Sequence, residues 1–143
     1  VLENGDYFDP VIRIRIETGM FIPAESYIHA QQVRMMHKLK LLQTFDNIDV
    51  LATPTTAIAA PKLNQERINI SNQNVHIREA LLRITRIFST LGFPAVSLPC
   101  GFTKNHLPIG LQIVAKPLEE KLMLRVANGY QESTKWHTYS PDI

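Results

Sequence analysis

The chain has 143 residues, and a chain of that length buries about 68–70% of the surface that its unfolded form exposes. Hydrophobic residues make up 45% of it and charged residues 20%, which fits a globular protein and argues against a disordered or fibrous one. The formal net charge is only +2, and the basic residues of the middle third are spread over separate elements. We therefore expect no direct binding to nucleic acid, which needs a denser basic patch.

Cys100 is the only cysteine, so the chain can form no internal disulfide and has no cysteine-rich metal site. This usage fits a reducing compartment, and we predict the cytoplasm. No apolar run approaches the roughly 18 residues of a membrane-spanning helix, and early acidic residues replace the basic and apolar regions of a signal peptide. The chain begins at Val1, which is compatible with processing or with a start inside a larger protein.

The first third of the chain predicts two helices. Apolar and charged residues alternate from Pro10 to Met20 as in a strand, but Asp9 as N-cap and Pro10 at the first position favour a helix, which Gly19 ends. Residues 24–45 predict a long amphipathic helix.

The remainder alternates between strands and helices, which indicates an α/β fold. We expect a buried strand at 49–53, a surface excursion at 57–74, and a single helix at 77–91 that Gly92 terminates. Strands at 95–98 and 109–115 then form a hairpin, a helix runs over 118–136, and residues 138–143 form an irregular tail.

Ser97 and Cys100 are possible nucleophiles, but neither has a supporting motif. Ser97 lacks the GxSxG turn that exposes a catalytic serine, and free cysteines are usually buried. The five histidines are scattered without a metal-ligand spacing, so we predict no metal and no cofactor.

Three arginines, Arg15, Arg34 and Arg86, stand among residues whose pattern predicts burial. A guanidinium can bind a carboxylate with two parallel hydrogen bonds, so each is a candidate for substrate recognition or for an internal ion pair. For Arg34 and Arg86 we favour the structural role, and for Arg15 both interpretations stay open.

Five segments occur in a recognisable order: YIHAQQVR, DVLATPTTAIAAP, TRIFSTLGFPAVSLPCGF, LPIGLQIVAKP and LMLRVANGYQESTKWH. Together they resemble the C-terminal part of the amidase signature family, which includes amide hydrolases and the A subunit of glutamyl-tRNA amidotransferase. The resemblance covers residues 7–137. It implies a mixed β-sheet with flanking helices, which this chain contains only in part.

The resemblance also implies the chemistry. Family members hydrolyse amides with two serines and a lysine. The serines belong to a Gly/Ser-rich signature, and both this signature and the lysine lie upstream of the matching region. This chain has no such signature, so we expect no catalytic residue within it, and Ser97 and Cys100 are not expected to be nucleophiles. The segment 91–102 around them is expected to build the sheet and a pocket wall.

The binding residues carry over less completely. Arg15, in RIETG, is similar to an arginine that binds the substrate carboxylate in the amidotransferase branch. Leu82 stands where that branch has the aspartate that holds the amino group of glutamine, and Ile87 and Ser89 replace a frequent proline and asparagine. Glutamine as substrate is therefore disfavoured.

Three hypotheses follow, of which the first is preferred. The chain is the C-terminal segment of an amidase acting on carboxylic amides, with a small-molecule amide as partner, no membrane association and self-association into a homo-oligomer. The alternatives are an inactive structural remnant of an amidase and part of the A subunit of a glutamyl-tRNA amidotransferase.

Overall fold

The computed structural model describes residues 5–140, and these divide into two compact units whose boundary lies within one long helix. The first unit ends at Met36. It contains helix α1 (Pro10–Thr18), short 3-10 turns at Gly5–Tyr7 and Gly19–Phe21, and the first part of helix α2 (Ala24–Thr44). None of its helical residues is buried.

The helix predicted after Asp9 is confirmed, and the strand alternative is wrong. The Asp9 carboxylate accepts hydrogen bonds from the backbone N–H groups of Val11 and Ile12, at 2.9 and 3.4 Å. These are two of the four donors that a helix leaves without an internal partner, so the cap and Pro10 fix the start of α1 despite the alternating pattern.

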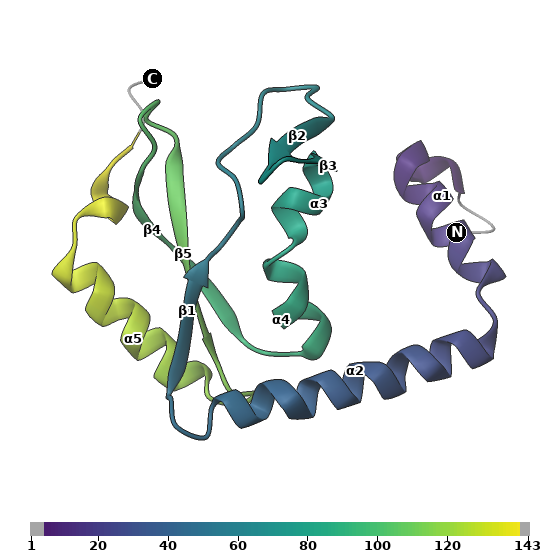
Figure 1. Ribbon diagram of the computed structural model, residues 1–143, viewed down its shortest axis with the longest axis horizontal. Coiled ribbons are helices and arrows are strands. Elements are labelled where there is room, and N and C mark those ends of the chain that lie inside the picture. The colour runs from purple at the N-terminus through teal and green to yellow at the C-terminus, as the bar shows by residue number, and fades with distance from the viewer. Residues whose placement is uncertain (1–4, 141–143) are drawn as a thin grey trace. The chain divides into compact units, whose positions relative to one another are not determined.

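The second unit is built on a three-stranded sheet with the order β1-β5-β4 (Figure 1). Strand β1 is Val50–Pro54, β4 is Ala95–Phe102 and β5 is Pro108–Ala115. Both neighbouring pairs are antiparallel, and β4 and β5 form the predicted hairpin. Since β5 is central, β1 and β4 are the edges of this sheet.

Successive residues of β5 point to opposite faces of the sheet, and each face carries its own hydrophobic cluster. Val114 packs in one cluster with Phe45 and with Phe88 of helix α4 (Thr85–Leu91). Ile113 and Ala115 pack in the other, with side chains of helix α5 (Glu120–Ser133). The sheet therefore has helices on both faces, which confirms the α/β fold class.

Strand β4 continues past Leu98, where the predicted strand ended, and contains an irregularity in this added part. The register between β4 and β5 shifts between Pro99 and Gly101, so Cys100 is the extra residue of a β-bulge. Its thiol donates a weak hydrogen bond to the carbonyl oxygen of Ile109 at 3.5 Å. Cys100 therefore has a structural position in the hairpin.

At the end of the segment 57–74, which was expected as a surface excursion, the structure has a hairpin that the sequence pattern did not indicate and that extends to His76. Strand β2 (Arg67–Ile70) pairs with β3 (Gln73–His76) through a two-residue turn of Ser71 and Asn72. Both turn residues have positive φ, 48° and 65°, which matches the twist of a tight hairpin. A glycine is the usual marker of such a turn, and its absence here concealed the hairpin.

The single helix predicted for residues 77–91 is wrong, because the structure divides it into α3 (Ile77–Leu82) and α4. Arg83 and Ile84 between them keep right-handed helical dihedral angles. The Thr85 hydroxyl donates to the carbonyl oxygen of Leu82 at 3.4 Å, and such a side-chain bond competes with the backbone ladder. The predicted end at Gly92 is confirmed, with φ 75° and its N–H bonded to the Phe88 carbonyl.

The final helix α5 is shorter than predicted at both ends. It starts after Leu118, whose positive φ of 71° is incompatible with a helix, and it ends at Ser133. A 3-10 turn, η3 (Trp136–Thr138), replaces its expected last turn. Of the predicted tail, residues 141–143 lie outside the described part of the chain.

Candidate functional site

Arg15, the predicted carboxylate-binding residue, lies in the last turn of α1 and is exposed. Its neighbour Arg13 is the one that forms ion pairs, with Glu17 at 2.7 Å and Asp6 at 3.0 Å. The hydrogen bond and the charge of Glu17 raise the pKa of Arg13 above its ordinary value. Arg15 has no hydrogen-bond or ion-pair partner among residues 5–140, so its guanidinium is open to a ligand.

Arg15, Arg34 and Arg86 are all exposed, and the expectation that the residues around them are buried is wrong for Arg15 and Arg34. The apolar residues around Arg15 and Arg34 belong to α1 and α2, in which no residue is buried. Arg86 lies on α4, whose buried side chains are Phe88 and Leu91. A periodic pattern predicts burial only when a second surface covers it.

Ser97 lies on β4, and its hydroxyl bonds to the hydroxyl of Thr55, which follows β1, at 2.6 Å. The two strands are separated by β5, and the bond passes over Gly110 of that strand. A Cβ atom on Gly110 would lie 2.6 Å from the Thr55 Oγ1 and 2.9 Å from the Ser97 Oγ. The glycine therefore makes room for this hydroxyl pair. Neither hydroxyl is a base, so the pair supplies no activation of Ser97 as a nucleophile.

Gln112 is the one polar residue that the described chain buries in its core, at 4% exposure. Its side-chain amide donates to the Thr53 hydroxyl on β1 at 3.2 Å. A buried amide needs such a partner, because an unsatisfied polar group in the core is costly. Gln112 and Thr53 thus join β5 to β1 through side chains as well as through the backbone.

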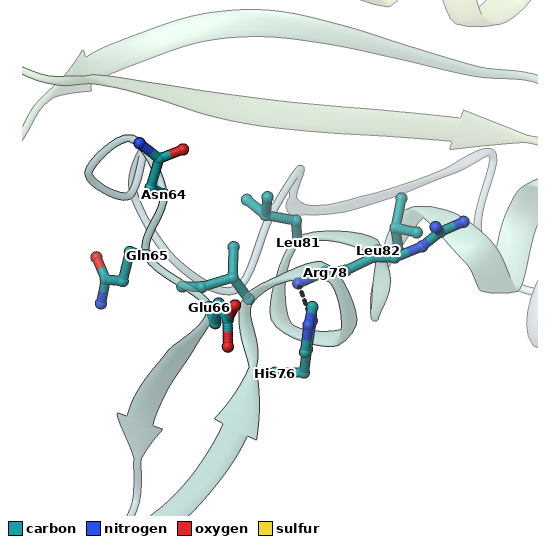
Figure 2. A pocket seen from close by; sticks show the side chains of 8 residues that line it. Asn64, Gln65, Glu66, His76, Arg78, Leu81 and Leu82 are labelled. Atoms are coloured by element: carbon teal, nitrogen blue, oxygen red, sulfur yellow. Dashed lines mark hydrogen bonds between the residues drawn. The ribbon is translucent and has the colours of Figure 1, made fainter. Parts of the chain in front are cut away.

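The second unit has an open cavity of about 600 Å³ that includes Leu82 (Figure 2). Its apolar residues come from α3, and its polar residues come mainly from the loop before β2 and from the end of β3. The lining consists of Ile77, Leu81 and Leu82, together with Asn64, Gln65, Glu66, His76 and Arg78. The volume is in the range of small-molecule sites, which are mainly apolar with a few polar groups.

His76 has a defined role in this cavity that the sequence did not predict. Its Nδ1 atom accepts a hydrogen bond from the backbone N–H of Arg78 at 3.1 Å and so caps α3 (Figure 2). In a neutral imidazole the other nitrogen, Nε2, then carries the proton, and its N–H group can donate a hydrogen bond to a ligand. Histidine is an uncommon cap, so its residue type alone was a weak signal for this arrangement.

Two further properties concern the part of the chain that the structure describes. No three His, Cys, Asp or Glu side chains gather there as they would around a metal ion. None of its helices combines the length and the apolar character that a membrane crossing requires.

The order of elements and the sheet define an α/β segment that displays a polar-rimmed cavity. The sequence model of the Amidase family matches residues 4–124. The chain therefore belongs to the amidase family.

Relatives and solved structures agree with this membership. The A subunit of the glutamyl-tRNA(Gln) amidotransferase of Chloroflexus aggregans is 36% identical over 98% of this chain. A crystal structure of an amidase superposes on 92% of the chain with a TM-score of 0.81 and 28% identity. A third structure superposes on 91% of this chain with a TM-score of 0.79 and 30% identity. It is described as a vestigial protein complex that reveals the evolutionary origins of an s-triazine catabolic enzyme.

The chain spans less than a third of the length of these proteins. It corresponds to 28% of the Chloroflexus aggregans protein, 30% of the amidase and 29% of the third protein. Family membership is thus established for a partial segment of the family's length.

Proposed function

We propose that this segment is the C-terminal part of an amidase that hydrolyses carboxylic amides, at C–N bonds other than peptide bonds. A serine attacks the amide carbonyl, a second serine relays the proton and a lysine acts as base, all three from polypeptide upstream of these residues. The observation that carries the proposal is the family match over residues 4–124 in a chain without a Gly/Ser-rich signature. The segment contributes scaffold and a pocket wall.

The cavity in Figure 2 is our candidate for a part of that pocket wall, and its lining lies outside the segment 91–102 that the sequence predicted as wall. Leu81 and Leu82 give it an apolar surface, which favours an apolar acyl group because contact with these side chains removes apolar area from water. The resemblance implies an aspartate at position 82 in enzymes that act on glutamine. A leucine cannot bind an ammonium group, which supports a substrate without one.

Arg15 is proposed to bind a carboxylate of the substrate. The support is its exposure at the end of α1 and its position in the RIETG segment, while the neighbouring Arg13 is already paired with two carboxylates. In the active full-length protein, Arg15→Gln should raise KM for an acidic amide about tenfold, because a charge-assisted bidentate contact is lost. Arg34→Gln is the matched control and should leave KM unchanged.

The decisive experiment examines both the gene and the chain. The 143-residue chain alone should not hydrolyse simple aromatic or aliphatic amides, and the DNA upstream of the Val1 codon should continue in frame into a lysine and a Ser/Gly-rich signature. Turnover by the isolated chain would contradict the proposed location of the triad. An in-frame stop close to Val1 would instead favour an inactive structural remnant.

The A subunit of a glutamyl-tRNA amidotransferase is a second candidate, favoured by the 36% identity to the Chloroflexus aggregans protein. Leu82 argues against it. The two are distinguished by offering the full-length protein L-glutamine and a simple apolar amide. Ammonia release from glutamine that exceeds turnover of the apolar amide would favour the amidotransferase.

We also propose a cytoplasmic location, no cofactor, no direct nucleic-acid contact and self-association. The support for self-association is the apolar surface of α1 and α2, where Val11, Ile14 and Met35 are each more than half exposed. Apolar surface of this extent is typical of an interface.

A further inference from the structure

Three aromatic side chains gather where the β4–β5 hairpin meets the turn η3. The ring of Phe102 lies 6.1 Å from that of Trp136 and 5.7 Å from that of Tyr139, both in edge-on geometry. Trp136 and Tyr139 are 6.1 Å apart and tilted by only 30°. We refer to Phe102, Trp136 and Tyr139 as the aromatic cluster. Its members are from 36% to 62% exposed, which is unusual for three adjacent large rings.

The aromatic cluster lines a cavity of about 610 Å³ together with two histidines, His106 and His137. Pro99 and Pro108 complete its apolar wall. This combination of many apolar atoms with a few polar groups, at this volume, is characteristic of sites for small molecules. The cavity in Figure 2 has a single histidine and no phenylalanine, tyrosine or tryptophan, so the two cavities suit different ligands.

His106 is held in its place by the hairpin turn. The Thr103 hydroxyl accepts hydrogen bonds from the N–H groups of Asn105 and Leu107, and the Thr103 carbonyl accepts one from the N–H of His106. His106 has a φ of 59°, a conformation that costs a residue with a Cβ some free energy. Strained residues of this kind persist where the surroundings fix them, and they concentrate at functional sites.

The charges around the cavity favour an anion. Both imidazoles can donate hydrogen bonds, and no Asp or Glu lines the cavity within residues 5–140. Lys104 belongs to the same hairpin turn as His106, and Lys135 directly precedes Trp136. A ligand with a carboxylate group would find hydrogen-bond donors in the two imidazoles and positive charge in the two lysines. An aromatic ring on the same ligand would stack on the aromatic cluster.

We propose that this cavity binds a small aromatic carboxylate, with its ring against Trp136 and Tyr139 and its carboxylate at His106 and His137. The inference depends on these residues alone and does not depend on the proposed amide hydrolysis. Failure of one leaves the other in place, because the experiment below measures binding and no turnover.

Calorimetric titration of the purified protein with 2-naphthoate tests the proposal. Two matched probes separate the contributions: cyclohexanecarboxylate has the charge without the aromatic ring, and 2-naphthylmethanol has the ring without the charge. We expect 2-naphthoate to bind about tenfold more tightly than either, since each lacks one set of contacts. An affinity for 2-naphthoate equal to that for either of the other two probes would overturn the proposal.

Variants locate the binding. His106→Gly removes the imidazole and keeps the turn, because glycine adopts positive φ without cost, and should weaken 2-naphthoate binding about tenfold. His29→Ala on α2 removes an exposed histidine elsewhere and should change nothing. Trp136 is the only tryptophan of the 143 residues, so 2-naphthoate should also quench its fluorescence. Unchanged affinity in His106→Gly would contradict the site.

Discussion

At the scale of single residues, close contacts in the second unit depend on particular side-chain sizes. The hydroxyls of Thr55 and Ser97 meet directly over Gly110. Phe45 is only 1% exposed, and its ring stacks on that of Phe93 with 5.7 Å between the ring centres. The first contact needs the smallest residue and the second needs a large ring. Each gives a prediction that a control residue of the same type can test.

Gly110→Ala should destabilise the protein by about 1–3 kcal/mol, since the added methyl group would overlap the Thr55 and Ser97 hydroxyls and disrupt their bond. The measurement is the midpoint of urea unfolding. Gly129→Ala is the control: apart from its chain neighbours and the backbone of its own helix, no atom lies within 4 Å of its added Cβ, and alanine favours the helix by about 0.5–1 kcal/mol. An unchanged midpoint for Gly110→Ala would refute the close contact.

Phe45→Ala should cost about 3–5 kcal/mol of unfolding free energy, because it removes a fully buried ring and leaves a cavity beside Phe93 and Val114. The same unfolding experiment measures it. Phe21→Ala removes an identical ring that is 84% exposed and should shift stability by less than about 0.5 kcal/mol. Similar losses in both variants would show that the cluster around Phe45 is not the core.

At the scale of elements, the ends of helices were the most predictable features. Asp9 and Gly92 were both identified from residue type, since an N-cap carboxylate and a left-handed C-terminal glycine satisfy backbone groups locally. The division of residues 77–91 was not predictable from spacing, because the apolar positions continue across Arg83 and Ile84.

Gly92→Ala should destabilise the protein by about 1–2 kcal/mol, because a Cβ disfavours the left-handed φ of 75°. Thermal unfolding followed by circular dichroism is the measurement. Gly19 ends α1 with an ordinary φ of −60° and open space around it, so Gly19→Ala should be neutral or slightly stabilising. A loss in Gly19→Ala equal to that in Gly92→Ala would exclude φ as the cause.

At the scale of the whole chain, the features that matter are exposed apolar surface and sheet edges that are open to further pairing. Strands β1 and β4 each pair on one side only within the described sheet, and unpaired strand edges attract further strands. The exposed isoleucines of α1 add apolar area that water disfavours. These features are what a partial segment of a larger fold would display.

The isolated 143-residue chain should therefore associate, with a mass by light scattering above that of one chain and rising with concentration. Replacing Val11 and Ile14 by lysine should shift the distribution toward the monomer, because both side chains are exposed and apolar. Replacing the exposed Glu25 by lysine adds a positive charge without removing apolar surface and serves as control. A monomer at every concentration would contradict self-association.

The candidate sites were predictable only in part. Arg15 and Leu82 were selected by resemblance, and the structure leaves the first exposed and places the second in a cavity. The cap by His76 and the aromatic cluster were missed. The cap is a local contact, but histidine is an uncommon capping residue and gave little signal. The aromatic cluster combines residues from separate elements, and no local spacing marks such a combination.

Residue order was enough to establish the α/β class, the helix that begins after Asp9, the end at Gly92, the β4–β5 hairpin and the family, because these depend on local backbone chemistry or on the succession of motifs. The exposure of Arg15, Arg34 and Arg86, and the meeting of Thr55 and Ser97 across Gly110, became known only from the folded chain. Burial and cross-strand contacts are set by what the fold brings against a residue, and Thr55 and Ser97 lie 42 residues apart in the chain.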